Sequence, residues 1–368
     1  MKVAIVNCFD TFLDRQTALL HFFQDRGDQV TAFLSDFRHV QKDYRTEAPV
    51  GFTMLHAAAY KKNLSVQRMW SHSKYAHSVY TALEQESWDL IWAIIPPNSL
   101  VKQCALYRAE HPETKLVFDV NDLWPESFPL GGMKKLPPFQ MWRFLRDHWL
   151  PQADCVVTEC DLFQKQLAIP DAKYGGTIYL CRSKDIPQPD SYPIPSDETW
   201  TLCYLGSINH IIDIDAIATV ISQLKRQRPV ILHIIGSGER QELLIQQAEQ
   251  AGAEVIYHGP IYDFQQKQVI FDQCHFGLNV MKASVCVGLT MKSIDYLAGG
   301  LPLLNTIPGD TWDRIEQERF GLNWAPDRGP DWYDFDQVHG RAAARSFYER
   351  ELSYKTFSQK AERVIAQL

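Results

Sequence analysis

The sequence predicts an α/β protein made of two Rossmann-like, doubly wound domains that face each other across a cleft. Three observations support this fold class. The chain has 368 residues, which is more than one ordinary hydrophobic core accommodates. Short apolar runs alternate with helix-compatible stretches in both halves, as in parallel sheets covered on both faces. The segment 184–195 contains four prolines, interrupts this alternation and is typical of a linker.

We therefore expect an N-terminal domain over residues 1–185 and a second domain over residues 186–345. The last stretch, 346–368, is helix-compatible and is expected to pack back on the first domain. Helical apolar spacing also occurs at 17–25 and 66–84. The expected strands of the first half are Lys2–Val6, Val30–Leu34, Leu90–Ile95, Leu116–Asp119 and Cys155–Thr158.

The second half repeats the alternation of apolar runs and helix-compatible stretches. Its expected strands are Leu202–Leu205, Ile231–Ile235, Glu254–Tyr257, Phe276–Val280 and Leu303–Asn305. Open parallel sheets bind ligands at the carboxyl ends of their strands. We therefore expect the functional residues in the loops that follow these runs.

Composition excludes several classes of protein. The formal net charge of -7 disfavours a nucleic-acid binder, which is normally basic. The eight cysteines form no C-x-x-C pair and the twelve histidines show no metal-ligand spacing, so we expect reduced thiols, no metal site and no cofactor. The sequence starts directly in a strand-like run, and no stretch reaches the roughly 20 apolar residues that span a bilayer. We expect a cytoplasmic protein whose membrane contact, if any, is peripheral.

The loops after the first two strands of the second half contain glycines that permit close approach of a ligand to the backbone. Gly206-Ser207 follows the first strand, where a helix N-terminus would attract phosphate, although a plain strand-to-helix turn also explains it. Gly236 and Gly238 follow the second strand, but Gln241 occupies the position of the third glycine of a dinucleotide fingerprint. Nicotinamide or flavin binding is therefore disfavoured.

The segment 288–302 is the most informative part of the sequence. It predicts a helix that begins near Leu289 or Thr290 and ends at the Gly299-Gly300 pair. Lys292 then lies in the first turn, where a cation opposes the helix dipole unless an anion binds there. Asp295 lies three residues further on, and either meets ribose hydroxyls or forms an ordinary helical pair with Lys292.

Two features of the first half have alternative interpretations. Asp119 and Asp122 follow a strand end, so either could orient an acceptor, and Asp122 could equally cap the next helix. Trp124 is expected to pack in the core rather than to stack on a sugar. The segment 133–146 mixes aromatic and cationic residues, and is either a helix that lies on an anionic membrane or a core-facing helix with a solvated basic side.

Several blocks resemble, in order and spacing, the retaining GT-B glycosyltransferases of the GT4 type. These blocks are Gly206-Ser207, Gly236-Ser237-Gly238-Glu239, His258-Gly259-Pro260-Ile261 and Lys292 to Pro302. In the first half, the run Phe118 to Ser127 contains Asp-Leu-Trp-Pro-Glu-Ser, as in bacterial GT4 enzymes that build surface polysaccharides.

The resemblance implies transfer of a sugar from a nucleotide-diphosphate donor, with UDP favoured, to a saccharide or lipid-linked acceptor, without a metal. It places the base near Gly259, Pro260 and Ile261, and the ribose at Asp295. The diphosphate would meet Lys292, Thr290 and the Gly206-Ser207 turn, while Gly236 and Gly238 would leave room for the nucleotide.

The sequence also departs from the family pattern. Val287 stands where the family has the first of two glutamates, and Asn209 and His210 follow the Gly206 turn where an arginine and a lysine usually bind the diphosphate. Two alternatives therefore remain: a sugar-nucleotide epimerase with the same fold, and a non-catalytic subunit that binds a partner or a glycan.

Overall fold

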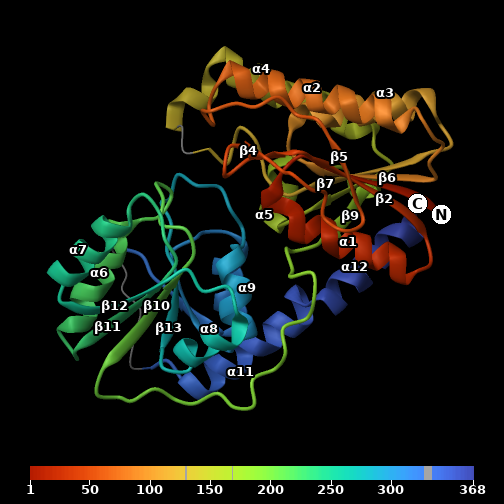
Figure 1. Ribbon diagram of the computed structural model, residues 1–368. Helices are drawn as coiled ribbons and strands as arrows, with labels where there is room; N and C mark the ends of the chain where they lie inside the picture. Colours follow the sequence, from red (N-terminus) through yellow and green to blue (C-terminus); the bar gives the residue numbers. More distant parts are fainter. Residues whose placement is uncertain (129–130, 168, 327–333) are drawn as a thin grey trace. The chain divides into compact units, whose positions relative to one another are not determined.

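The computed structural model describes residues 1–128, 131–167, 169–326 and 334–368 (Figure 1). The chain divides into two compact units. Unit 1 contains Met1–Lys184 and Tyr354–Leu368, and unit 2 contains Asp185–Ser353. The first division lies one residue from the expected boundary, whereas residues 346–353 belong to unit 2 and only the final helix rejoins unit 1.

Unit 1 is built on a parallel sheet with the strand order β5-β2-β1-β6-β7-β8-β9. Its strands are β1 (Lys2–Asn7), β2 (Gln29–Ser35), β5 (Phe52–Leu55), β6 (Leu90–Ile95), β7 (Lys115–Val120), β8 (Cys155–Thr158) and β9 (Tyr174–Thr177). A separate antiparallel ribbon contains β3 (Phe37–Arg38) and β4 (Asp43–Tyr44). The five strands predicted for this half are confirmed.

Helices cover both faces of the unit 1 sheet. Figure 1 shows α2, α3 and α4 on one side of the strands and α1 and α12 on the other. Successive side chains of a strand point to opposite faces of the sheet, so a fully buried strand needs helices on both faces. On one face, Val3 and Ile5 pack in one core with Phe357 and Val364 of the last helix. The helices and turns are η1 (Asp10–Phe12), α1 (Leu13–Asp25), α2 (Val66–Leu83), α3 (Asn98–Glu110), η2 (Gly131–Lys135), α4 (Pro137–Trp149), η3 (Leu150–Gln152), α5 (Asp161–Leu167), η4 (Asp171–Lys173) and α12 (Tyr354–Gln367).

Unit 2 contains a second parallel sheet, in the order β12-β11-β10-β13-β14-β15. Its strands are β10 (Trp200–Leu205), β11 (Val230–Ile235), β12 (Ala253–Gly259), β13 (Phe276–Asn279), β14 (Leu303–Asn305) and β15 (Gly321–Asn323). Its helices are α6 (Ile214–Lys225), α7 (Gln241–Gln250), α8 (Phe264–Phe271), α9 (Met291–Ala298), α10 (Asp310–Glu318), α11 (Gln337–Phe347) and η5 (Tyr348–Leu352). The five predicted strands are confirmed, and β15 was not predicted.

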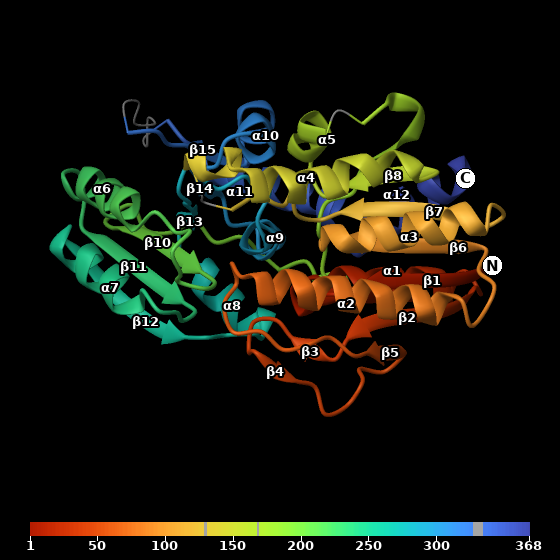
Figure 2. The ribbon, with the colours of Figure 1, turned by 90° about the horizontal axis from the view of Figure 1, so that it is seen from above.

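The strand order of unit 2 determines where a ligand can bind. From the central strand β10 the chain moves outward to β11 and β12, then returns to β13 on the other side of β10. The connections after β10 and β13 therefore leave the sheet in opposite directions, which opens a crevice at their carboxyl ends. Figure 2 shows β10 and β13 as neighbours, with the helices of unit 2 on either side.

Within the described residues, no helix is both long and apolar enough to cross a bilayer.

Candidate functional site

The N-terminus of α9 lies beside the crevice at the ends of β10 and β13. Thr290 is the N-cap residue, with an extended backbone, and no side chain caps the helix. The Thr290 hydroxyl instead donates to Asn279 Oδ1 at 2.8 Å and lies 2.8 Å from Ser293 Oγ. The predicted start and end of the helix are confirmed, since it spans Met291–Ala298 and ends at Gly299. First-turn amides without a side-chain cap favour an anion at this end.

Lys292 extends from this first turn toward the end of β10. Its ammonium nitrogen is buried, has no hydrogen-bond partner within the described structure, and lies 4.6 Å from the centre of the Tyr204 ring. The Tyr204 hydroxyl donates to the Ser207 carbonyl at 2.8 Å, so this ring joins the ammonium group to the Gly206-Ser207 turn. Burial lowers the pKa of Lys292 to about 7. An anion would supply the charge partner that this ammonium group lacks.

Asp295 does not pair with Lys292. Its Oδ2 atom accepts a hydrogen bond from Lys267 Nζ of α8 at 2.5 Å, and both side chains are buried. The interpretation of Lys292 and Asp295 as an ordinary helical pair is therefore wrong. Sequence reasoning missed Lys267, although a lysine on the buried face of a short helix is a recognisable sign of a buried ion pair. Contact of Asp295 with a ribose stays a prediction.

The glycines after β10 and β11 have different roles. Gly206 has a φ of 115°, and a side chain built on it would meet nothing within 4 Å. A Cβ atom on Gly236 would lie 2.0 Å from the Gly206 carbonyl oxygen, and one on Gly238 would lie 2.3 Å from the Ile208 carbonyl oxygen. Contact of Gly236 and Gly238 with a nucleotide stays a prediction, but their lack of a side chain already has a structural reason. They leave room for the backbone of the neighbouring loop.

Backbone hydrogen bonds join three loops at the carboxyl edge of the sheet. The Gly206 amide donates to Ile235 O at 2.9 Å, and the Gly236 amide donates to Gly259 O at 2.9 Å. Gly259 has a φ of 71° and borders open space, Pro260 is exposed and Ile261 is half-buried. The structure thus gathers Gly206, Gly236 and Gly259 in adjacent loops, as the sequence suggested.

Three asparagines at the ends of β13, β14 and β15 form a ladder that sequence reasoning missed. Asn279, Asn305 and Asn323 are register partners. The Asn279 amide donates to Asn305 Oδ1, and the Asn305 amide donates to Asn323 Oδ1, both at 2.9 Å. Because Asn279 also accepts from Thr290, the ladder fixes the first turn of α9 to three strands. The repeated Leu-Asn at three strand ends was the signal available in the sequence.

Asp119 lies inside unit 1 rather than at a ligand site. Its carboxylate accepts from Arg15 Nε at 2.9 Å and Arg15 Nη2 at 2.8 Å, and also from Trp92 and Asn121 side chains. Both members of the ion pair are fully buried. The prediction that Asp119 orients an acceptor is therefore wrong, since every oxygen is occupied in holding α1 against β7. Arg15 could not be identified beforehand, because it lies 104 residues away in sequence.

Asp122 is half-buried and interacts with its own turn. Its Oδ1 accepts from the Leu123 amide at 2.8 Å and its Oδ2 from Trp124 Nε1 at 2.6 Å, and burial raises its pKa. No helix begins here, so the capping interpretation is wrong. Trp124 packs against the rings of Phe9 and His72, which confirms its predicted role in packing. Contact of Asp122 with an acceptor stays a prediction.

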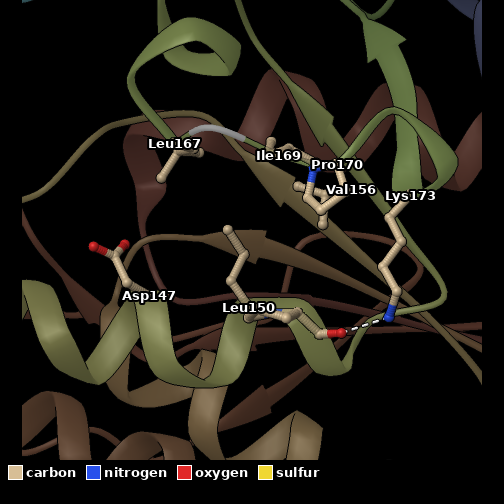
Figure 3. A pocket seen from close by; sticks show the side chains of 8 residues that line it. Asp147, Leu150, Val156, Leu167, Ile169, Pro170 and Lys173 are labelled. Carbon is tan, nitrogen blue, oxygen red and sulfur yellow. Dashed lines mark hydrogen bonds between the residues drawn. The ribbon is translucent and has the colours of Figure 1, made fainter.

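A cavity of about 80 Å³ lies between η3 and the end of α5, away from these residues (Figure 3). Its lining is largely apolar, with Leu150, Val156 and Ile169 among the side chains. Lys173 donates to the carbonyl oxygens of Pro151 and Ala153, at 2.5 and 2.9 Å, so its ammonium group stabilises a chain turn. We assign no function to this cavity.

Among the described residues, no group of three or more His, Cys, Asp or Glu side chains has the arrangement of a metal site.

Neither a protein-family model nor a curated protein sequence matches the chain. Solved structures do. Sucrose-phosphate synthase from Thermosynechococcus elongatus is 14% identical, with a TM-score of 0.70 over 100% of this chain and 98% of that one. HepE of Anabaena in complex with UDP and glucose is 12% identical, and the lipopolysaccharide outer core galactosyltransferase WaaB is 14% identical. Both have a TM-score of 0.66 over the full length of both chains. These similarities confirm the predicted GT-B fold.

The Arg15–Asp119 ion pair gives a prediction about stability. Asp119→Ala should lower the free energy of unfolding by about 3–5 kcal/mol, because it leaves the Arg15 guanidinium buried without a counter-ion. Urea unfolding monitored by circular dichroism measures this change. Glu113→Ala, at an exposed carboxylate of the same unit, is the matched control and should change stability little. An Asp119→Ala variant as stable as that control would contradict the structural role.

Proposed function

We propose that this protein is a glycosyltransferase that moves a sugar from a nucleotide-diphosphate donor, preferably a UDP-sugar, to a saccharide or lipid-linked acceptor. The observation that carries the proposal is the buried Lys292 ammonium group, which has no hydrogen-bond partner among the residues that the structure describes and belongs to the uncapped first turn of α9. Two similar structures support the choice of donor, since HepE was solved with UDP and with UDP-glucose. WaaB is a galactosyltransferase of the same fold.

In this proposal the donor lies along the carboxyl edge of the unit 2 sheet. The diphosphate contacts Lys292, the first-turn amides of α9 and the Gly206-Ser207 turn. Because the Thr290 hydroxyl is already engaged with Asn279, Thr290 contributes its position at the helix N-terminus rather than a hydroxyl contact. The base lies against Gly259-Pro260-Ile261, and a ribose hydroxyl reaches the Asp295 carboxylate that Lys267 holds.

The proposed reaction proceeds with retention and without a metal. Negative charge builds on the departing diphosphate as its bond to the sugar breaks, and the Lys292 ammonium and the α9 dipole stabilise that charge. The same diphosphate accepts the proton of the attacking acceptor hydroxyl, so no protein carboxylate need act as a strong base. Asp122 of unit 1 is the residue proposed to orient the acceptor.

The proposed biological setting is synthesis of a bacterial surface polysaccharide or related glycoconjugate in the cytoplasm. The support is the GT4-like run Asp122-Leu123-Trp124-Pro125-Glu126-Ser127, whose indole ring is buried against Phe9 and His72.

Nucleotide binding tests the proposal directly. UDP should raise the melting temperature of the wild-type protein, because a ligand that binds only the folded state stabilises it. Lys292→Met should abolish most of this shift. It should also lower kcat/KM by about 10²–10³-fold with the nucleotide-sugar donor that screening identifies. The fold should survive, since the substitution replaces a buried cation with an apolar side chain of similar length. Differential scanning fluorimetry with a panel of nucleoside diphosphates measures the shift.

Lys225→Met is the matched control, because it removes an exposed lysine of the same unit. It should leave both the UDP shift and the turnover unchanged. A wild-type protein whose melting temperature responds to no nucleoside diphosphate would favour the non-catalytic alternative. Full turnover in Lys292→Met would remove this residue from the mechanism.

The pKa of Lys292 gives a prediction about pH. Only the protonated lysine attracts the diphosphate, and its pKa in the free protein is about 7. UDP affinity should therefore fall as the pH rises from about 7 to about 9, and binding at the upper end should take up a proton. Isothermal titration calorimetry in buffers of different ionisation enthalpy measures both effects. Lys292→Arg stays charged in this window, so its affinity should not decline; a parallel decline in both proteins would contradict the assignment.

The same pKa also affects folding. Between about pH 7 and pH 10.5 the unfolded chain holds a proton on Lys292 that the folded protein has lost. The contribution of this group to stability therefore rises with pH across that window.

Metal independence is a separate prediction. Transfer should persist after treatment with EDTA, because the ammonium group and the helix dipole supply the charge that a divalent cation would supply elsewhere. Turnover that disappears with EDTA and returns with added magnesium or manganese ions would show that the proposed mechanism is incomplete. The assay needs only the donor and the acceptor identified by screening.

A further inference from the structure

Large apolar side chains face solvent where the first turns of α2 lie near the start of α4. Val66 is 83% exposed and Trp70 is 53% exposed on α2, while Met141 is 72% and Phe144 is 64% exposed on α4. We call this the α2–α4 surface, defined by Val66, Met69, Trp70, Leu136, Met141 and Phe144. So many exposed apolar residues in one region of a folded protein indicate an interaction site.

The core-facing interpretation of α4 predicted that its basic residues face solvent, but Arg146 faces the protein interior. Arg146 is 1% exposed and bonded to both carboxylate oxygens of Glu126, and Arg143 also pairs with Glu126. Trp142 is buried on the same side. The expectation of a solvated basic side is therefore wrong for Arg146, whereas Lys135 of the same segment is exposed. Because its inner face is already packed through Trp142 and Arg146, α4 cannot bury Met141 and Phe144 by rotating inward.

Residues at the start of α2 and at the start of α4 line one groove. A groove of about 200 Å³ has Val66 and Met69 on one wall and Pro138 and Phe139 on the other. The starts of the two helices therefore both border this groove. An interaction that covers Met141 and Phe144 can also reach Val66 and Trp70.

The charge around the α2–α4 surface is positive, although the chain as a whole carries -7. No aspartate or glutamate occurs in residues 48–83 or 127–146. The carboxylates that flank the second range, Glu126 and Asp147, pair with arginines, and those that flank the first range are Glu47 and Glu84. The exposed cations of this region are Lys61, Lys62, Lys74 and Lys135. The Lys74 ammonium lies 4.9 Å from the Trp70 ring centre.

We propose that the α2–α4 surface docks on an anionic phospholipid membrane. Apolar side chains of α2 and α4 enter the boundary between headgroups and acyl chains, and the lysines of this region meet the lipid phosphates. Trp70 suits this boundary because its ring is amphipathic. The acid-free surroundings select a negatively charged partner, and a lipid surface accepts irregular apolar protrusions without a complementary shape. This proposal is independent of the proposed catalytic activity.

Vesicle sedimentation tests the proposal on the full chain. The wild-type protein should co-sediment with vesicles of phosphatidylcholine and phosphatidylglycerol, and far less with phosphatidylcholine alone. The double variant Met141→Glu/Phe144→Glu should bind the anionic vesicles roughly tenfold or more weakly, since it removes two large apolar contacts and adds two negative charges. Val66→Glu/Trp70→Glu, on the other helix, should show a similar loss. Added salt should weaken wild-type binding.

Val338→Glu is the matched control, because Val338 is 65% exposed on α11 of unit 2. It should bind vesicles as the wild type does. The UDP melting shift, measured on every variant, separates a loss of docking from a loss of the nucleotide site. Wild-type protein that stays in the supernatant with anionic vesicles would overturn the proposal. So would a wild-type dimer that Met141→Glu/Phe144→Glu converts to a monomer, because the surface would then bind a second copy of this chain.

Discussion

The buried ammonium group of Lys292 is the feature on which the proposed site depends. A charge taken out of water is costly unless it finds a counter-ion, and the lowered pKa of this lysine expresses that cost. A carboxylate is available three residues further along α9, but Asp295 is engaged with Lys267. Two buried ammonium groups are thus associated with α9: that of Lys267 is paired, and that of Lys292 has no partner among the described residues. The unpaired one is at the end of the helix that attracts anions.

The surrounding fold keeps this arrangement rigid. The asparagine ladder fixes the first turn of α9 to the ends of three strands, through the contact between Asn279 and Thr290. On the other side of the crevice, Gly236 and Gly238 let the loop after β11 contact the Gly206 turn directly. The Tyr204 ring then spans the distance between that turn and the ammonium group. Charge, helix terminus and glycine turn therefore hold fixed positions before a ligand binds, which is the condition for electrostatic catalysis.

The sequence predicted most strands of both sheets because buried parallel strands are short, aliphatic and bounded by polar turns, but it missed the edge strands β5, β9 and β15. Leu303–Asn305, for example, was predicted to the residue. It also located the start of α9 and placed Lys292 in its first turn. It failed where a partner is distant along the chain. Nothing near Asp119 indicates that Arg15 would occupy it, and nothing near Gly236 indicates that the Gly206 carbonyl would lie over it. Local patterns give elements, whereas side-chain partners depend on tertiary packing.

The two proposed interaction sites break the usual rule of burial in opposite ways. At α9 a cation is buried without a charge partner in the described part of the chain, and at the α2–α4 surface large apolar side chains are exposed. Each arrangement is unfavourable for the isolated chain, and each proposal names a ligand that would make it favourable: an anion in the first case and a lipid surface in the second. The helix α4 shows this departure, because it buries Arg146 and exposes Phe144. An ordinary amphipathic surface helix would bury the phenylalanine and expose the arginine. Departures from the usual burial of charged and apolar residues often occur at functional sites. We therefore base both proposals on these two departures.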